Sequence, residues 1–184
     1  MTIERKLLST SPSGGATDVA EVFSTHLYKG NNTTNVINNG IDLAGEGGMV
    51  WLKSRSAAGS GSIFDTIRGR AHNLQTAEAG GQDTFAANAG VTSFNSNGFS
   101  LGVGSYGSTN GNNVTYASWT FRNKNKFFKA VTFSYGGSSS SPTVVTHNLG
   151  CTVGMTIVKH TTGNHNWYVQ HKDVTGNDNN GALN

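Results

Sequence analysis

Short runs in which hydrophobic and polar residues alternate recur along most of this chain. The first run, residues 21–29, reads EVFSTHLYK, so Phe23, Thr25 and Leu27 face one side of an extended strand and their neighbours face the other. Similar runs predict further strands at 48–53, 62–68, 91–94, 99–101, 115–122, 127–135, 143–146, 155–159 and 166–170. Strands that recur roughly every 8 to 12 residues are typical of sandwiches and barrels. The pattern therefore predicts an all-β fold.

The residues between the runs support this prediction. The chain has 25 Gly and only 2 Pro, and Asn95-Ser96-Asn97-Gly98 is typical of a tight hairpin turn. One short helical turn is expected within 15–21, where Thr17 or Asp18 could act as its cap. Aromatic side chains bury large areas, so those in the runs are expected to lie mainly inside. They are Trp51, Phe64, Phe99, Trp119, Phe121 and Phe133.

Part of the pattern occurs twice. Aligning the segment at Phe23 with that at Phe128 gives an offset of 128 − 23 = 105 residues, and aligning Gly48 with Gly154 gives 154 − 48 = 106. The alternative is chance similarity between two Gly-rich β segments, whereas a solenoid is excluded because its units are roughly 20 to 45 residues long.

The repeat predicts how the chain is organised. We expect an N-terminal arm at 1–20, a β-sandwich domain at 21–126, and a second, shortened copy of the small β unit at 127–184. Either residues 173–184 close this second copy in a shortened form, or the chain is the front part of a longer architecture.

Composition excludes several classes of protein. Of the 184 residues, 35% are hydrophobic and 12% charged, and the formal net charge is +3, whereas a disordered tail combines low hydrophobicity with high net charge. No apolar run reaches the length of about 18 residues that a membrane helix needs, so neither membrane insertion nor classical export is expected. The single Cys151 cannot form an internal disulfide.

Motifs for chemistry are absent or incomplete. The glycines of 102–107 match G-x-G-x-x-G, but neither a helix nor an acidic residue follows as dinucleotide binding requires. No G-x-S-x-G elbow or catalytic cysteine signature occurs. Four histidines lie close in sequence without the spacing of a metal site: His147, His160, His165 and His171. We therefore expect no enzyme activity, no cofactor and no metal.

Two further features have a functional and a structural interpretation. The acids Glu46, Asp65, Glu78 and Asp83 are scattered, and a glycosidase pair could be assembled only from residues distant in sequence. Residues 122–129 mix four basic residues with two aromatic ones, as single-strand nucleic-acid sites do. A turn between strands also has to be solvated, and lysines on a sheet edge prevent unwanted pairing. We favour the structural interpretation and expect no nucleic-acid partner.

Several strings of the chain, taken in order, resemble the tail-fibre-like virion proteins of tailed phages, especially marine cyanophages. They are FSTHLYKGNNTTNVINNGIDLAGEGGMVWLKSR, IFDTIRGRAHNLQT, TSFNSNGFSLG, ASWTFRNKNKFF and VVTHNLGCTVGMTIVKH, and the resemblance extends from about Glu4 to His171. It implies a lectin-like, jelly-roll type antiparallel β-sandwich with a repeated small β unit. It also implies a virion protein that acts by assembly and surface contact.

The expected function is therefore that of a structural protein of a tailed-phage virion, part of a tail fibre or another appendage, that contacts a host-surface glycan. The alternatives are a capsid decoration or cement protein and, from a different class, a polysaccharide-degrading enzyme on a sandwich. Expected partners are other virion proteins, further copies of the chain in a homotrimer, and a host cell-surface glycan. Covering exposed strand edges also favours such assembly.

The N-terminal arm is the expected virion docking segment. Its apolar and basic residues precede a flexible Ser/Gly spacer at 9–15, and a short arm cannot bury its own apolar side chains. The alternative is that the arm folds back as an edge strand of its own sandwich. The residues expected to dock on a neighbouring virion protein are Ile3, Arg5, Lys6, Leu7 and Leu8.

Overall fold

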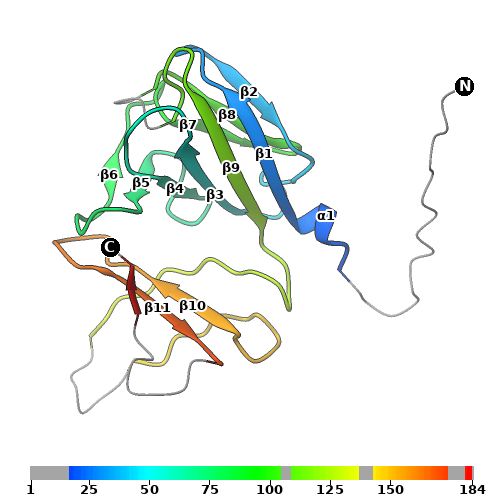
Figure 1. The fold of residues 1–184 in the computed structure, drawn as a ribbon. Coiled ribbons are helices and arrows are strands. Elements are labelled where there is room, and N and C mark those ends of the chain that lie inside the picture. Colours follow the sequence, from blue (N-terminus) through cyan, green and yellow to red (C-terminus); the bar gives the residue numbers. More distant parts are fainter. Residues whose placement is uncertain (1–16, 105–108, 137–142, 174–180, 184) are drawn as a thin grey trace, which may run out of the picture.

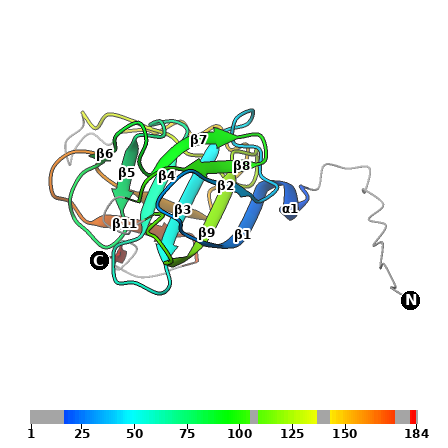
Figure 2. The same ribbon diagram turned by 90° about the horizontal axis from the view of Figure 1, so that it is seen from above.

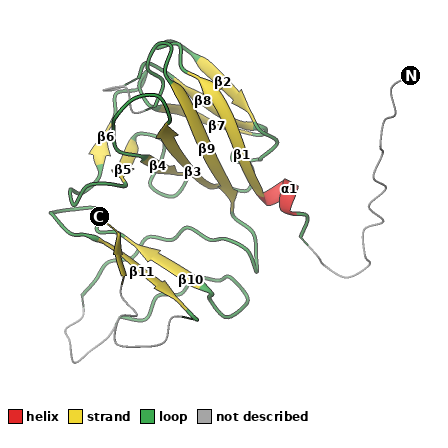
Figure 3. Ribbon diagram, viewed as in Figure 1, coloured by secondary structure: helices red, strands yellow, loops and turns green. Residues whose placement is uncertain are grey.

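The computed structural model describes residues 17–104, 109–136, 143–173 and 181–183. In these ranges the chain is nearly all β, with one short helix (Figures 1 and 3). The elements are α1 (Val19–Val22), β1 (Phe23–Lys29), β2 (Asn35–Asn38), β3 (Gly48–Ser54), β4 (Ser62–Asp65), β5 (His72–Gln75), β6 (Asp83–Thr84), β7 (Val91–Asn95), β8 (Gly98–Leu101), β9 (Thr115–Arg122), β10 (Met155–Val158), β11 (Trp167–His171) and β12 (Gly181–Leu183). The predicted fold class, an all-β antiparallel sandwich, is confirmed.

The sandwich consists of two antiparallel sheets. The larger sheet has the order β1-β9-β3-β4-β5-β6, and the smaller has the order β2-β8-β7 (Figure 2). A separate sheet, β10-β11-β12, follows near the C-terminus. Strand β9 lies inside the larger sheet, where Phe121 is opposite Phe23 of β1 and Trp119 is opposite Trp51 of β3. A late strand therefore joins two early ones.

The apolar core lies between the two sheets. Strand β3 alternates strictly, so Val50 and Leu52 point into the core and Trp51 points to the opposite face of the larger sheet. The side chains of this core are Ile37, Ile41, Leu43, Val50, Leu52, Phe64, Val91, Phe99 and Leu101. The sheets thus bury one continuous apolar layer.

The aromatic side chains predicted to lie inside divide into three groups. Phe64 and Phe99 are fully buried, as predicted. Trp51, Trp119 and Phe121 are only partly buried. Alternation does not tell which face of a strand meets the second sheet, and Trp51 lies on the face that the smaller sheet does not cover. The sixth prediction is wrong, because Phe133 is 47% exposed in a segment that forms no strand.

Local signals place two elements correctly. The Oδ1 atom of Asp18 accepts a hydrogen bond of 3.0 Å from the backbone N–H of Ala20, which caps α1. Strands β7 and β8 form the predicted hairpin, closed by the pair of Asn95 and Gly98. Gly98 has φ +130°, and a Cβ atom there would lie 2.1 Å from the carbonyl oxygen of Ile37. Only glycine fits this position.

A buried amide ties together the loops at one end of the sandwich. The Asn110 side chain is fully buried, and its Nδ2 donates to Oδ1 of Asn31 and to the carbonyl oxygens of Thr33 and Gly102. Its Oδ1 accepts from the backbone N–H of Asn31 and from Nδ2 of Asn35, both at 3.1 Å. The β1–β2 turn and the loop before β9 are therefore held by one side chain.

The small β unit of the repeat is visible in the strand registers. In the β3–β4 hairpin Met49 pairs with Asp65, and in the β10–β11 hairpin Met155 pairs with His171. Both differences, 155 − 49 and 171 − 65, equal 106. Strand β12 then pairs with β11 as β5 pairs with β4. The two hairpins share one register, as expected of a duplicated unit.

Two strands expected in the second copy are absent from the part of the chain that the structure describes. Residues 127–135 contribute only the isolated bridge between Lys124 and Phe128, and residues 143–146 form no strand. In the first unit, the segment equivalent to 128–135 is β1, and among the described strands its partner is β9. No described strand occupies the position of β9 in the second unit, so 128–135 has no ladder to join.

Replacing Asn110 with Ala should lower the free energy of unfolding by about 3 kcal/mol, because it leaves several buried backbone and side-chain groups without partners. The exposed Asn112 of the same loop is the matched control, and Asn112→Ala should change stability by less than about 0.5 kcal/mol. Urea denaturation of both variants measures the difference. Equal stabilities would show that Asn110 does not hold the loops.

Candidate functional site

The second unit packs against the face of the larger sheet that the smaller sheet leaves open. Trp167 of β11 is buried against Ile63 of β4 and Leu74 of β5, with Met49 and Trp51 partly buried beside them. The indole Nε1 of Trp167 donates a 3.0 Å hydrogen bond to a backbone carbonyl oxygen of β5. This anchor fixes the β10–β11 loop beside the segment that follows β5.

In each hairpin, a lysine near the end of the first strand donates hydrogen bonds to carbonyl oxygens of loops. Lys53 Nζ donates a 2.7 Å hydrogen bond to the carbonyl oxygen of Gly59. The equivalent Lys159 Nζ donates to the carbonyl oxygen of His165 and also to that of Ala79, the latter at 2.7 Å. Burial lowers the pKa of the Lys159 ammonium group. In the second unit this lysine therefore links two loops.

Backbone hydrogen bonds reinforce the contact between these loops. The N–H of Gln82 donates to the carbonyl oxygen of Thr161 at 2.9 Å, and the N–H of His165 donates to that of Ala79 at 2.8 Å. Glycine permits this close approach, because a Cβ atom on Gly81 would lie 2.7 Å from the Thr161 carbonyl oxygen. The two loops are therefore held in direct contact.

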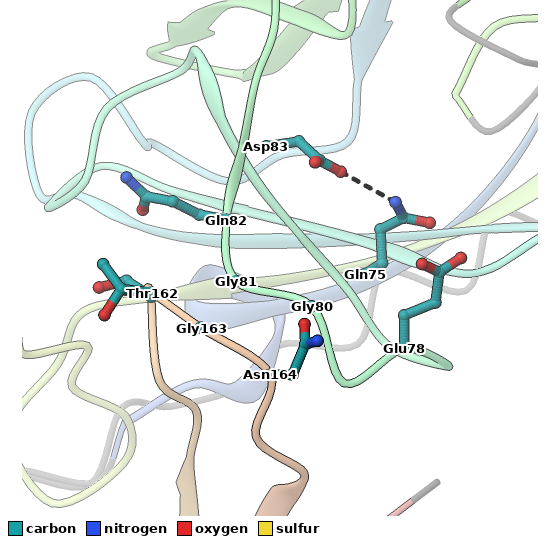
Figure 4. A pocket seen from close by; sticks show the side chains of 10 residues that line it. Gln75, Glu78, Gly80, Gly81, Gln82, Asp83, Thr162, Gly163 and Asn164 are labelled. Atoms are coloured by element: carbon teal, nitrogen blue, oxygen red, sulfur yellow. Dashed lines mark hydrogen bonds between the residues drawn. The ribbon is translucent and has the colours of Figure 1, made fainter.

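A pocket of about 450 Å³ lies between these loops (Figure 4). All its lining residues are polar or glycine: Gln75, Glu78, Gly80, Gly81, Gln82, Asp83, Thr161, Thr162, Gly163 and Asn164. In Figure 4 the residues of 75–83 come from the end of β5, the start of β6 and the loop between them, and Thr162 and Asn164 come from the loop between β10 and β11. The pocket therefore exists only where the two β units meet.

Hydrogen bonds orient the polar groups on the sandwich side of the pocket. Gln75 Nε2 donates to Asp83 Oδ2 at 2.9 Å, and Ser60 Oγ donates to Glu78 Oε1 at 3.2 Å. Each carboxylate has a second oxygen and further lone pairs that can accept from a ligand. Amides, carboxylates and hydroxyls without an apolar wall suit a hydroxyl-rich ligand such as a sugar.

The structure brings together only part of what the sequence singled out. Glu78 and Asp83, scattered acids in the sequence, line the same pocket. Asp65 instead forms an ion pair of 2.6 Å with Arg68, and Glu46 lines a second, smaller pocket. The five residues of the expected docking arm, at positions 3 and 5–8, lie outside the described residues.

The remaining pocket residues carry no sequence signal. Gln75, Gln82 and Asn164 are common polar residues in loops, and their proximity depends on how the second unit docks. The repeat was the one available indication, because it places 161–164 in the loop equivalent to that between β3 and β4.

The histidines show no arrangement for a metal. His160 and His165 stack with ring centroids 3.9 Å apart, and His147 Nδ1 accepts from the backbone N–H of Leu149 at 3.0 Å. In the described ranges, no group of three or more His, Cys, Asp or Glu side chains could hold a metal ion. In the same ranges, no helix is long and apolar enough to cross a membrane.

The fold and the pocket define a β-sandwich with a polar, ligand-sized recess at the contact between two related units. Comparison with known families places the chain more closely: the profile of a domain of unknown function, DUF7483, matches residues 18–129, and the protein belongs to this family. No curated protein and no solved structure matches the chain. The matched range covers the sandwich and one wall of the pocket, and the other wall, 161–164, lies outside it.

Replacing Lys159 with Met should loosen the contact between the two loops, because two carbonyl oxygens lose their charged donor. We expect faster hydrogen exchange at the amides of Gln82 and His165, measured by mass spectrometry. The matched control is Lys53→Met, whose lysine bonds only within its own hairpin loop. It should leave both amides unchanged, and an equal effect of the two variants would contradict the link.

Proposed function

We propose that this protein is a structural component of a tailed-phage virion, part of a tail fibre or another appendage, and that it contacts a host-surface glycan. Three observations support the proposal. The sequence resembles virion proteins of this kind, the fold is a turn-rich β-sandwich, and a polar pocket lies at the contact between two β units. The pocket is the observation that carries the glycan part of the proposal.

The chemistry of the pocket favours a saccharide over other ligands. Two carboxylates accept hydrogen bonds from hydroxyl groups, and the side chains of Gln82 and Asn164 can both donate and accept. Most lining side chains are exposed, so the recess is open rather than enclosed. An open polar site gives modest affinity, and several copies in a trimeric assembly would raise the avidity for a surface that repeats the same sugar.

The site is tested with oligosaccharides prepared from the host envelope polysaccharide. Asp83→Ala and Asn164→Ala should each weaken binding about tenfold, because each removes a hydrogen-bonding group from one of the two walls. The control is Asn112→Ala, an exposed asparagine outside the pocket. Isothermal titration calorimetry measures all three variants, and a loss of affinity in the control alone would contradict the site.

A second candidate, polysaccharide hydrolysis, is favoured by the presence of Glu78 and Asp83 in the same pocket, since glycosidases use paired carboxylates. The same incubations distinguish the two functions. Binding without release of reducing ends supports a contact protein. Release of reducing ends that is abolished by both Glu78→Gln and Asp83→Asn would instead make the protein an enzyme.

The virion part of the proposal is tested on purified phage particles. Antibodies raised against residues 17–136 should label an appendage in electron micrographs, because contact with a host surface requires exposure at the periphery of the particle. Labelling of the capsid would instead support a decoration or cement protein. Particles without the protein would contradict both versions.

A further inference from the structure

The segment that follows β9 carries positive charge that the rest of the fold does not use. Of the four basic side chains in 122–129, Arg122 lies 3.9 Å from the carboxylate of Glu21. Within the ranges that the structure describes, the other three form neither an ion pair nor a side-chain hydrogen bond. They are Lys124, Lys126 and Lys129. Strand β9 lies inside the larger sheet and 127–135 form no strand, so these lysines neither protect a sheet edge nor lie in a turn between two strands.

Two of these lysines line a second pocket, of about 250 Å³, which we call the basic pocket. Its lining residues are Glu46, Asn123, Lys124, Asn125 and Lys129. Two ammonium groups and one carboxylate give this lining a formal charge of 2 − 1 = +1. Pockets for drug-sized ligands measure about 300 to 1,000 Å³. The basic pocket therefore suits a smaller group that carries negative charge.

Asn123 supplies a donor that has no partner in the protein. Its side chain is only 7% exposed, and its Oδ1 accepts from the backbone N–H of Ala130 at 3.2 Å. Its Nδ2 has no acceptor among the described residues and is not sealed from solvent. A Cβ atom on Gly47 would lie 2.9 Å from this Nδ2, so glycine keeps the space beside the amide clear. Buried polar groups are normally hydrogen-bonded, and an acceptor on a ligand would satisfy this one.

Backbone contacts hold the walls of the basic pocket in place before any ligand binds. The N–H of Asn123 donates to the carbonyl oxygen of Gly47 at 2.9 Å, which joins the segment after β9 to the neighbour of Glu46. The N–H of Lys124 donates to the carbonyl oxygen of Phe128 at 2.9 Å, and the N–H of Phe128 donates back at 3.1 Å. Binding therefore has to order side chains only, which reduces its entropic cost.

The chemistry of the lining favours a charged sugar over a nucleic acid. Ammonium and amide groups donate to an anionic oxygen, whereas the carboxylate of Glu46 can accept from a hydroxyl group on the same ligand. A chain of phosphates would bring further negative charge toward Glu46. Single-strand nucleic-acid sites also stack successive bases on aromatic rings. Phe128 packs on Phe121 with ring centroids 5.3 Å apart, which leaves Phe127 alone of the two aromatics in this segment for stacking.

We propose that the basic pocket binds one anionic sugar unit, with a carboxylate or a sulfate group, of an acidic polysaccharide. Lys124 and Lys129 contact the anionic group, and Asn123 Nδ2 donates to one of its oxygens. The inference goes beyond the proposed function, because it concerns a different pocket of opposite charge. It holds whether or not the pocket at 75–83 and 161–164 binds a glycan.

The probes are a tetramer of galacturonic acid, the methyl ester of that tetramer and a sulfated galactose tetramer, each titrated calorimetrically into the full chain at about 0.15 M salt. The acidic tetramer, the sulfated tetramer or both should bind at least about tenfold more tightly than the uncharged ester. The two charged probes distinguish a carboxylate from a sulfate. Equal affinity for all three, or no binding of either charged probe, would overturn the proposal.

Variants test the residues of the basic pocket. Lys124→Met and Lys129→Met should each weaken binding of the charged probe about threefold to fivefold. Lys126→Met is the matched control, since it removes the same charge from the same segment outside the pocket lining, and its effect should stay below about twofold. Asn123→Asp keeps the acceptor for Ala130 but removes the free donor, and should abolish the preference for the charged probe. An equal loss in Lys126→Met would show attraction to the whole segment and would overturn the site.

Nuclear magnetic resonance of the isotopically labelled full chain locates the bound probe. The amide signals of Asn123 and Asn125 should shift on binding, whereas those of Gln82 and Asn164 in the other pocket should not. Shifts confined to Gln82 and Asn164 would place the charged sugar in that other pocket and would overturn the proposal. Tighter binding of a single-stranded thymidine decamer than of either charged tetramer would identify a nucleic-acid surface and would overturn it equally.

Discussion

The two faces of the larger sheet set the constraint on which the rest of the structure depends. Each of its strands presents alternate side chains to opposite sides, and the smaller sheet of three strands covers one side only. Val50 and Phe64 enter the core on that side, while Trp51 and Ile63 remain on the other. An uncovered sheet face of this kind is costly in water. The docking of Trp167 from the second unit reduces this cost, and the position of that unit follows from it.

The contact between the two polar loops follows from this docking. Where β11 meets β5, two loops come together whose carbonyl groups could otherwise bond only to water, and Lys159 donates to one carbonyl of each. The same approach of the loops creates the pocket, so the side chains of Asp83 and Asn164 line a common space only while the two units stay in contact. The proposed binding of a glycan would therefore depend on the stability of this contact.

Local and periodic features of the fold were predictable from the sequence, and features that depend on docking were not. Alternation identified β1, β3, β4, β7, β8 and β9 of the sandwich, whereas the short strands β2, β5 and β6 were not predicted. The Asn-Gly pair identified the β7–β8 hairpin through the positive φ of Gly98. The repeat anticipated the common register of the two hairpins. Alternation failed at 127–135, because a strand forms only where a partner offers hydrogen bonds. The pocket residues could not be found either, since their proximity comes from the contact of Trp167 with Leu74, which no local pattern encodes.

The place of β9 in the sheet also determines the order in which the chain can fold. Phe23 of β1 pairs with Phe121 of β9, which is 121 − 23 = 98 residues further along the chain. The same strand, β9, also pairs with one side of β3. During synthesis, the backbone groups of β1 and β3 on these sides therefore stay unpaired until residues 115–122 have been made. Contacts between segments so distant in sequence close slowly, and open edges invite pairing between chains. The yield of folded protein therefore depends on whether β9 pairs with β1 and β3 before two partly synthesised chains associate through these open edges.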